Sequence, residues 1–192
     1  MTISEYGLRL SSITIDADGS PSGYIAWYNH STDDHKIQLL RPSPKNEKYG
    51  VQRMEMLAIY FALVENQHQI GRIAKSREIR QRQGQHQQQL VVNIRSDSKT
   101  SIEQLLGISQ IRDAVLQRIC SAIKKLLERL PYLIIFHHLE RTKNIAGLLL
   151  EQRRRKEEEK SLMYQYEKYY YPGITRLREV MISENSHVLA TA

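Results

Sequence analysis

Three acidic residues stand where folding of the chain would bring them to one place. Asp97 follows the apolar run 90–94, Asp18 closes the alternating run 12–17, and Glu55 lies in a segment with helical periodicity. The carboxyl ends of strands usually open on a crevice, and divalent cations prefer carboxylate oxygens as ligands. The spacing therefore predicts a divalent-metal site at one edge of a sheet.

Two of these carboxylates also have a simpler interpretation. Asp97 precedes Ser98 and Thr100, which makes it a candidate cap for the next helix. Glu55 lies among apolar residues, where an unpaired carboxylate is costly, although an exposed flank of that helix would also accommodate it. Because both residues fit one scheme with Asp18, the metal interpretation is favoured.

The composition indicates one globular domain with a polyanionic partner. The chain has 192 residues, 41% hydrophobic and 26% charged, and Lys and Arg outnumber Asp and Glu by 28 to 21. The net charge of +7 favours nucleic acid or an anionic surface as the partner. The single Cys120 excludes an internal disulfide, and no apolar run reaches the roughly 18 residues of a membrane span. We expect a cytoplasmic protein with no membrane association.

Periodicity and turn residues predict an α/β fold. An antiparallel meander comes first, and strands then alternate with helices, so we expect a mixed five-stranded sheet flanked by helices. The expected strands cover 12–17, 24–28, 36–40, 90–94 and 132–136, and the expected helices begin near residues 52, 101, 111 and 145.

Two segments stand apart from this domain, which we place at 1–150. The insertion 65–89 is rich in glutamine and carries basic residues, which suggests either a polar arm that extends a helix or solvated filler. If it is an arm, its phosphate contacts would come from Arg72, Lys75, Arg77, Arg80 and Arg82.

The second segment, 151–192, is predicted to be a charged helical extension and tail. Acidic and basic residues lie four apart in 151–160, as in Glu151 and Arg155, which indicates a solvated helix. Leu162, Tyr166 and Tyr169 then restore an apolar face. That face would either fold back onto the domain or contact a second copy, giving a homodimer through the long C-terminal helix.

Four motifs occur in order along the chain: the Asp-Gly-Ser and Gly-Tyr-Ile-Ala of 18–26, the Arg-Met-Glu-Met of 53–56, the Ser-Asp-Ser of 96–98 and the segment 138–149. In these motifs the sequence resembles type 1 ribonuclease H and its superfamily. The order, the spacing and the expected element types agree over most of the chain.

This resemblance implies a metal-dependent endonuclease that hydrolyses the RNA strand of RNA–DNA hybrids with two Mg²⁺ or Mn²⁺ ions. It implies Asp18, Glu55 and Asp97 as catalytic metal ligands. The residues it implies for substrate binding are Ser20, Gln52, Arg53, Ser98 and Asn144. Two alternatives stay open: a catalytically weakened nucleic-acid-binding module, and a DNA nuclease of the same superfamily, such as a junction resolvase or transposase.

The fourth metal ligand departs from the family pattern. Gly147 stands where the family has an aspartate on its last helix. We predict Glu151 as the replacement, because it lies one helical turn later and its side chain inclines toward the N-terminus. Glu140 in the preceding loop is another candidate, and Asp16 on the first strand is a third, weaker one.

Overall fold

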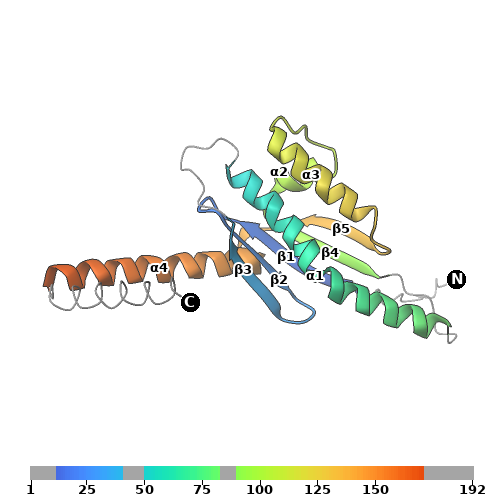
Figure 1. Cartoon of the computed structure of the whole chain (residues 1–192), viewed down its shortest axis with the longest axis horizontal. Helices are drawn as coiled ribbons and strands as arrows, with labels where there is room; N and C mark the ends of the chain where they lie inside the picture. Colours follow the sequence, from blue (N-terminus) through green and yellow to red (C-terminus); the bar gives the residue numbers. More distant parts are fainter. Residues whose placement is uncertain (1–11, 41–49, 83–89, 171–192) are drawn as a thin grey trace, which may run out of the picture. The chain divides into compact units, whose positions relative to one another are not determined.

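The computed structural model describes residues 12–40, 50–82 and 90–170, without the side chains of 77–82 and 167. The described residues group into two units that divide between Leu150 and Glu151. The first unit holds one five-stranded sheet with the order β3-β2-β1-β4-β5 (Figure 1). Its strands are β1 (Ser12–Gly19), β2 (Tyr24–Asn29), β3 (Asp34–Leu39), β4 (Val91–Ser96) and β5 (Leu133–His138).

The pairing pattern confirms the expected mixed sheet. β1 pairs antiparallel with β2 and parallel with β4, while β3 and β5 form the two edges. Alternation along β1 places Ile13, Ile15 and Ala17 in the core and turns Asp16 and Asp18 to the opposite face. The central strand therefore carries both the core and the acidic residues.

Three helices cover the core face of the sheet: α1 (Gly50–Arg82), α2 (Lys99–Leu105) and α3 (Ala114–Leu127). α3 is amphipathic, with Leu116, Cys120 and Ile123 buried at helical spacing. The Asp113 carboxylate caps α3 by accepting a hydrogen bond of 2.8 Å from the Leu116 N–H. α3 therefore starts later than the periodicity suggested.

The short helix η1 (Arg141–Lys143) leads into α4 (Ile145–Tyr170). Ala146 and Leu150 of α4 pack with Ala26 of β2 in a small second apolar cluster. The rest of α4 belongs to the second unit, where ion pairs four residues apart include Arg153 with Glu157 and Arg154 with Glu158. No helix in the described ranges combines the length and the apolar character needed to cross a membrane.

The insertion 65–89 continues α1 as helix as far as Arg82. Arg72 and Lys75 are exposed on this part of α1. The side chains of Arg77, Arg80 and Arg82, and residues 83–89 as a whole, lie outside the described part, as does the tail from residue 171.

Candidate metal centre

Asp18, Glu55 and Asp97 form one carboxylate cluster, in which one ligand oxygen from each lies within 4.8 Å of the others. Asp18 is the penultimate residue of β1 and pairs with Ala26 of β2, while Asp97 directly follows β4. The ladder between the parallel strands β1 and β4 ends with the pair Asp16 and Arg95. Asp18 and Asp97 therefore lie side by side, each two residues beyond that pair. Asp18 is 8% exposed, and the other two are partly buried.

Gly19 allows α1 to bring Glu55 to the cluster. A Cβ added at Gly19 would lie 2.2 Å from the backbone carbon of Met54 and 2.4 Å from the Glu55 nitrogen, so a side chain here would collide with α1. The Gly19 N–H also donates a hydrogen bond of 3.3 Å to Glu55 Oε2. The glycine after Asp18 thus has a packing reason: β1 and the first turns of α1 touch at this residue.

The cluster concentrates negative charge in a poorly solvated place. Burial, followed by the charge of Asp97, raises the pKa of Asp18 from 3.8 to about 7. Burial, followed by the charges of Asp18 and Asp97, raises the pKa of Glu55 from 4.5 to about 9. The Gly19 N–H and the Arg141 guanidinium lower the pKa of Asp18 and offset only part of this.

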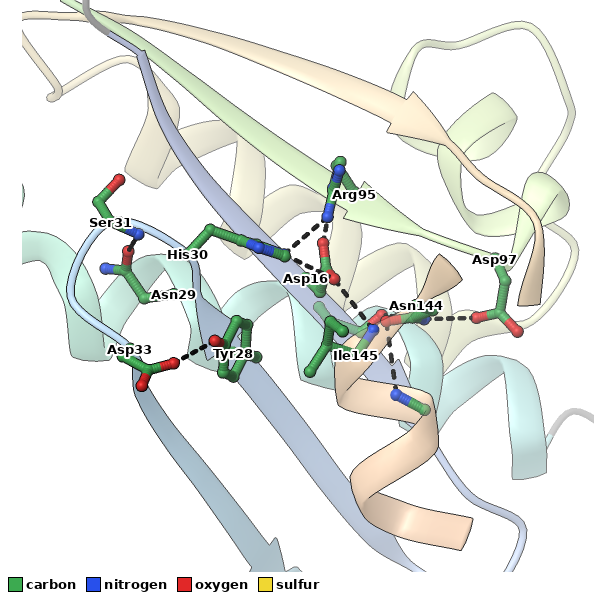
Figure 2. Close-up of polar contacts among 12 residues, drawn as sticks. Asp16, Tyr28, Asn29, His30, Ser31, Asp33, Arg95, Asp97, Asn144 and Ile145 are labelled. Carbon is green, nitrogen blue, oxygen red and sulfur yellow. Dashed lines mark hydrogen bonds and ion pairs between the residues drawn. The ribbon is translucent and has the colours of Figure 1, made fainter. Parts of the chain in front are cut away.

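Asp97 is oriented by Asn144, which comes immediately before α4. Asn144 Nδ2 donates hydrogen bonds of 2.8 Å to Asp97 Oδ1 and 3.2 Å to the Ala17 carbonyl oxygen (Figure 2). The cap residue of α2 is Ser98, and it forms no side-chain capping bond. The simpler interpretation of Asp97 as a helix cap is therefore wrong, and its carboxylate is held toward Glu55 and Asp18 instead.

Gly147 lies directly against Asp18. A Cβ added at Gly147 would lie 3.0 Å from Asp18 Oδ2, so any side chain at this position would enter the cluster. Glu140 is exposed and pairs with Lys143 at 3.0 Å. Glu151 belongs to the second unit, where Arg155 donates a hydrogen bond of 2.6 Å to it. Its role as the fourth ligand stays a prediction.

Asp16, the remaining candidate, is engaged elsewhere. It is wholly buried, and Arg95 Nε donates a hydrogen bond of 2.6 Å to its Oδ1. Asp16 Oδ2 lies 2.9 Å from His30 Nε2 and accepts a hydrogen bond of 3.0 Å from the Ile145 N–H (Figure 2). Asp16 is not among the three carboxylates that could hold an ion.

The predicted substrate-binding residues differ in their surroundings. Arg53 forms a paired contact with Asp113 at 3.1 and 2.7 Å, and Asn144 is wholly buried. The Ser20 hydroxyl lies in the turn between β1 and β2, 2.8 Å from Ser22 Oγ. The Ser98 hydroxyl donates to Ser101 Oγ at 2.8 Å. Their roles toward substrate, together with that of the partly buried Gln52, stay predictions.

Two features of the site were missed in the sequence. Arg141 contributes positive charge to Asp18, and only its place shortly before Asn144 hinted at this. The network of Asp16, Arg95 and His30 joins residues from three separate segments, so no local pattern announces it.

The donor set fits a hard divalent cation. The three residues offer only carboxylate oxygens, which are the ligands Mg²⁺ and Mn²⁺ take in proteins. The raised pKa values of Asp18 and Glu55 indicate that the folded protein disfavours having both of these carboxyls charged without a counter-charge. A bound cation would supply that counter-charge, so the cluster is compatible with divalent-metal binding.

Comparison with known proteins identifies the fold through structure alone. No protein-family model and no curated protein match the sequence. The chain is similar to RNase H1 from the halophilic archaeon Halobacterium salinarum NRC-1, with 17% identity and a TM-score of 0.52 over 70% of this chain and 90% of that one. It is also similar to LC11-RNase H1, isolated from compost by a metagenomic approach, with 19% identity and a TM-score of 0.56 over 72% and 91%.

LC11-RNase H1 has also been solved in complex with an RNA/DNA hybrid. That structure gives 19% identity and a TM-score of 0.50, over 69% of this chain and 88% of that one. The five-stranded sheet and its flanking helices agree with the resemblance in the sequence motifs. The chain therefore has the ribonuclease H-like fold, and its carboxylate cluster lies at the carboxyl ends of the central strands β1 and β4.

Proposed function

We propose that this protein is a metal-dependent endonuclease that hydrolyses the RNA strand of RNA–DNA hybrids. The observation that carries the proposal is the convergence of the Asp18, Glu55 and Asp97 carboxylates within 4.8 Å. The ribonuclease H-like fold supports it, as does the hybrid-bound state of one structural neighbour. The net charge of +7 suits a polyanionic substrate.

In this proposal the chain's own residues would hold and orient the reacting groups. When bound, two divalent cations would supply Lewis acidity at the attacking water and at the leaving 3′ oxygen. Asp18, the least exposed of the three carboxylates, would hold the ions together with Glu55 and Asp97. Asn144 keeps Asp97 in place through the 2.8 Å hydrogen bond.

Substrate contacts would come from residues beside the cluster and from the basic half of α1. Ser20, Gln52 and Ser98 offer hydroxyl and amide groups that suit 2′-hydroxyls in an A-form minor groove, whereas the buried Asn144 would act on substrate through the Asp97 carboxylate that it holds. Arg53, together with Arg72 and Lys75 on the exposed surface of α1, is proposed to face phosphates.

Hydrolysis of a labelled RNA–DNA hybrid, compared with duplex DNA and double-stranded RNA in Mg²⁺ or Mn²⁺, tests this function. We expect cleavage of the hybrid only. Asp97→Asn should lower the rate by about 100-fold or more, because even outer partners of metal ligands are typically worth 10–100-fold. Asp34→Asn, the same change at an exposed residue of β3, is the matched control and should cleave normally.

Gly147 favours a second candidate, the catalytically weakened nucleic-acid-binding module. It places no side chain against Asp18, where the family has its fourth carboxylate. Hybrid binding without cleavage in either metal, with Asp97→Asn binding as well as the natural protein, would establish this alternative in place of the enzyme.

A further inference from the structure

The buried Asp16 connects β4, the start of α4 and the turn that follows β2. It accepts hydrogen bonds from Arg95 on β4 and from the first backbone N–H of α4, and it lies within 2.9 Å of the ring nitrogen of His30. Arg95 Nη2 also lies 2.6 Å from His30 Nε2, so the three side chains form one group (Figure 2). Asp16 has no exposed surface.

The contact between Asp16 and Arg95 fixes the strand positions that precede two of the proposed metal ligands. Asp16 and Arg95 form the last pair of the β1–β4 ladder, and each stands two residues before a ligand, Asp18 or Asp97. Their ion pair of 2.6 Å therefore locks the two strands together at the point where the ligands emerge. A bond between a charged donor and a charged acceptor is among the stronger ones in proteins.

The third contact fixes the start of α4. The Ile145 N–H has no carbonyl partner within its own helix, as is usual for a first turn, and Asp16 supplies its acceptor at 3.0 Å. The residue before it is Asn144, whose amide holds Asp97 at 2.8 Å. Gly147, one residue after Ala146, lies against Asp18. Any shift of this turn would move both contacts to the cluster.

We infer that Asp16 is a positioning residue, which sets the geometry of Asp18 and Asp97 by fixing Arg95 and the first turn of α4, and through that turn Asn144. This rests on the proposed function for its catalytic consequence. Asp16 holds no ion itself; it determines where the groups that do so are placed.

Asp16→Asn tests the inference, because it keeps the shape and removes the charge. We expect kcat for hybrid cleavage to fall on the order of 10-fold, as for loss of charge-assisted hydrogen bonding, with KM for the hybrid unchanged. The NMR signals of the Asn144 side-chain amide should shift as well. If Asp16→Asn fails to fold, the pair Asp16→Ala with Arg95→Ala removes both charges together and should give the same kinetic result.

Glu65→Gln is the matched control. Glu65 also joins separate elements, since it accepts hydrogen bonds of 2.8 Å from Trp27 Nε1 and 2.6 Å from Lys36 Nζ, but it has no described contact with α4. The Glu65→Gln substitution should lower the free energy of unfolding without changing kcat or the NMR signals of the Asn144 amide. An unchanged kcat in folded Asp16→Asn, or an equal loss in Glu65→Gln, would overturn the inference.

The two proposals fail separately. If the natural protein does not cleave the hybrid, the proposed function is wrong, and calorimetric Mg²⁺ binding and the Asn144 signals then decide the role of Asp16. Weaker Mg²⁺ binding with displaced Asn144 signals in Asp16→Asn supports positioning. Unaltered Mg²⁺ affinity and unaltered signals reject it.

Discussion

At the scale of single residues, folding brings three acidic side chains together in the carboxylate cluster and removes part of their solvent. Asp18, Glu55 and Asp97 are brought within 4.8 Å of one another, and two of them have strongly raised pKa values. Gly19 makes this approach sterically possible, and Gly147 leaves one side of Asp18 without a side chain. Protons and divalent cations should therefore compete for the same oxygens.

We predict that protein freed of divalent cations loses stability as the pH rises. The pKa of Asp18 is raised from 3.8 to about 7, and that of Glu55 from 4.5 to about 9. Between pH 3.8 and about pH 9 the folded protein therefore binds more protons at these two carboxyls than the unfolded chain does. The free energy of unfolding then decreases with pH across that interval. Denaturant unfolding in chelator over this range measures it.

The control for this pH effect is Glu55→Gln, which removes the more strongly shifted carboxyl and should reduce the slope. Saturating Mg²⁺ should reduce the slope of the natural protein in the same way. Stability that does not vary with pH in chelator would contradict the charge account of the cluster.

Gly147→Asp should raise the affinity for Mg²⁺ and lower the thermal stability of the protein without bound metal. The new Cβ would lie 3.0 Å from Asp18 Oδ2, so a fourth carboxylate would join the three already there. We expect Mg²⁺ affinity, measured by calorimetry, to rise about tenfold, or about 1.4 kcal/mol. Cleavage in Mg²⁺ should become faster, and Tm in chelator should fall.

Gly147→Asn separates charge from shape and should show neither gain in Mg²⁺ affinity nor faster cleavage. Glu151→Gln tests the predicted substitute ligand, and a fall in Mg²⁺ affinity is the expected result. Equal Mg²⁺ affinities for the Asp and Asn variants at position 147 would show that this position does not reach the ions.

At the scale of elements, the 33 residues of α1 both position Glu55 and cover the core. Its first turns place Glu55 against Gly19, and its middle packs Met56, Ile59 and Leu63 into the core. Beyond Ile70 it carries the basic insertion as continuous helix. Gly71 lies in that stretch, with nothing within 4 Å of an added Cβ.

Gly71→Ala should raise the free energy of unfolding by about 0.5–1 kcal/mol, because alanine restricts the unfolded chain and favours helix. The expected gain in Tm is roughly 2–4 °C per kcal/mol for a chain of this size. Gly107→Ala is the control: that site is equally open, but its φ of +76° disfavours alanine, so Tm should fall. A gain in both variants would contradict this argument.

The helices and strands were largely predictable from the sequence, whereas the side-chain contacts that join distant segments were not. Alternation and turn residues located all five strands, and the outcome confirms the mixed sheet. Boundaries moved where a side chain decided them, as when Asp113 delays the start of α3. The alternation along β1 places Asp16 on the same strand face as Asp18, which makes it a weak ligand candidate, but its three partners come from distant segments that no local pattern links to it.

At the scale of the whole molecule, each unit has its own arrangement of apolar residues. The first packs buried apolar clusters against both faces of its sheet, and it also exposes single side chains such as Leu106 and Ile108. The second exposes a group near the C-terminal end of α4, which consists of Leu162, Met163, Tyr164, Tyr166, Tyr169 and Tyr170. Exposed apolar groups of this kind often mark contact sites.

We predict that the full chain forms a homodimer through this part of α4 and that a chain ending after Leu150 is a monomer. Burial of the exposed apolar side chains against a second copy supplies the stabilisation. Sedimentation equilibrium measures both masses. Leu162→Glu should give a monomer that keeps its helical circular dichroism, and a monomeric full chain at all concentrations would refute the prediction.

The bond from Ile145 to Asp16 spans 129 positions of the chain, and the one from Asn144 to Ala17 spans 127. Closing such long loops is entropically unfavourable until other contacts support them, so pairings of this range form late in folding. During synthesis the three carboxylates leave the ribosome well before the helix that arranges them. A nascent chain that stops short of Asn144 would contain all three carboxylates of the cluster and still lack the amide that holds Asp97 in place.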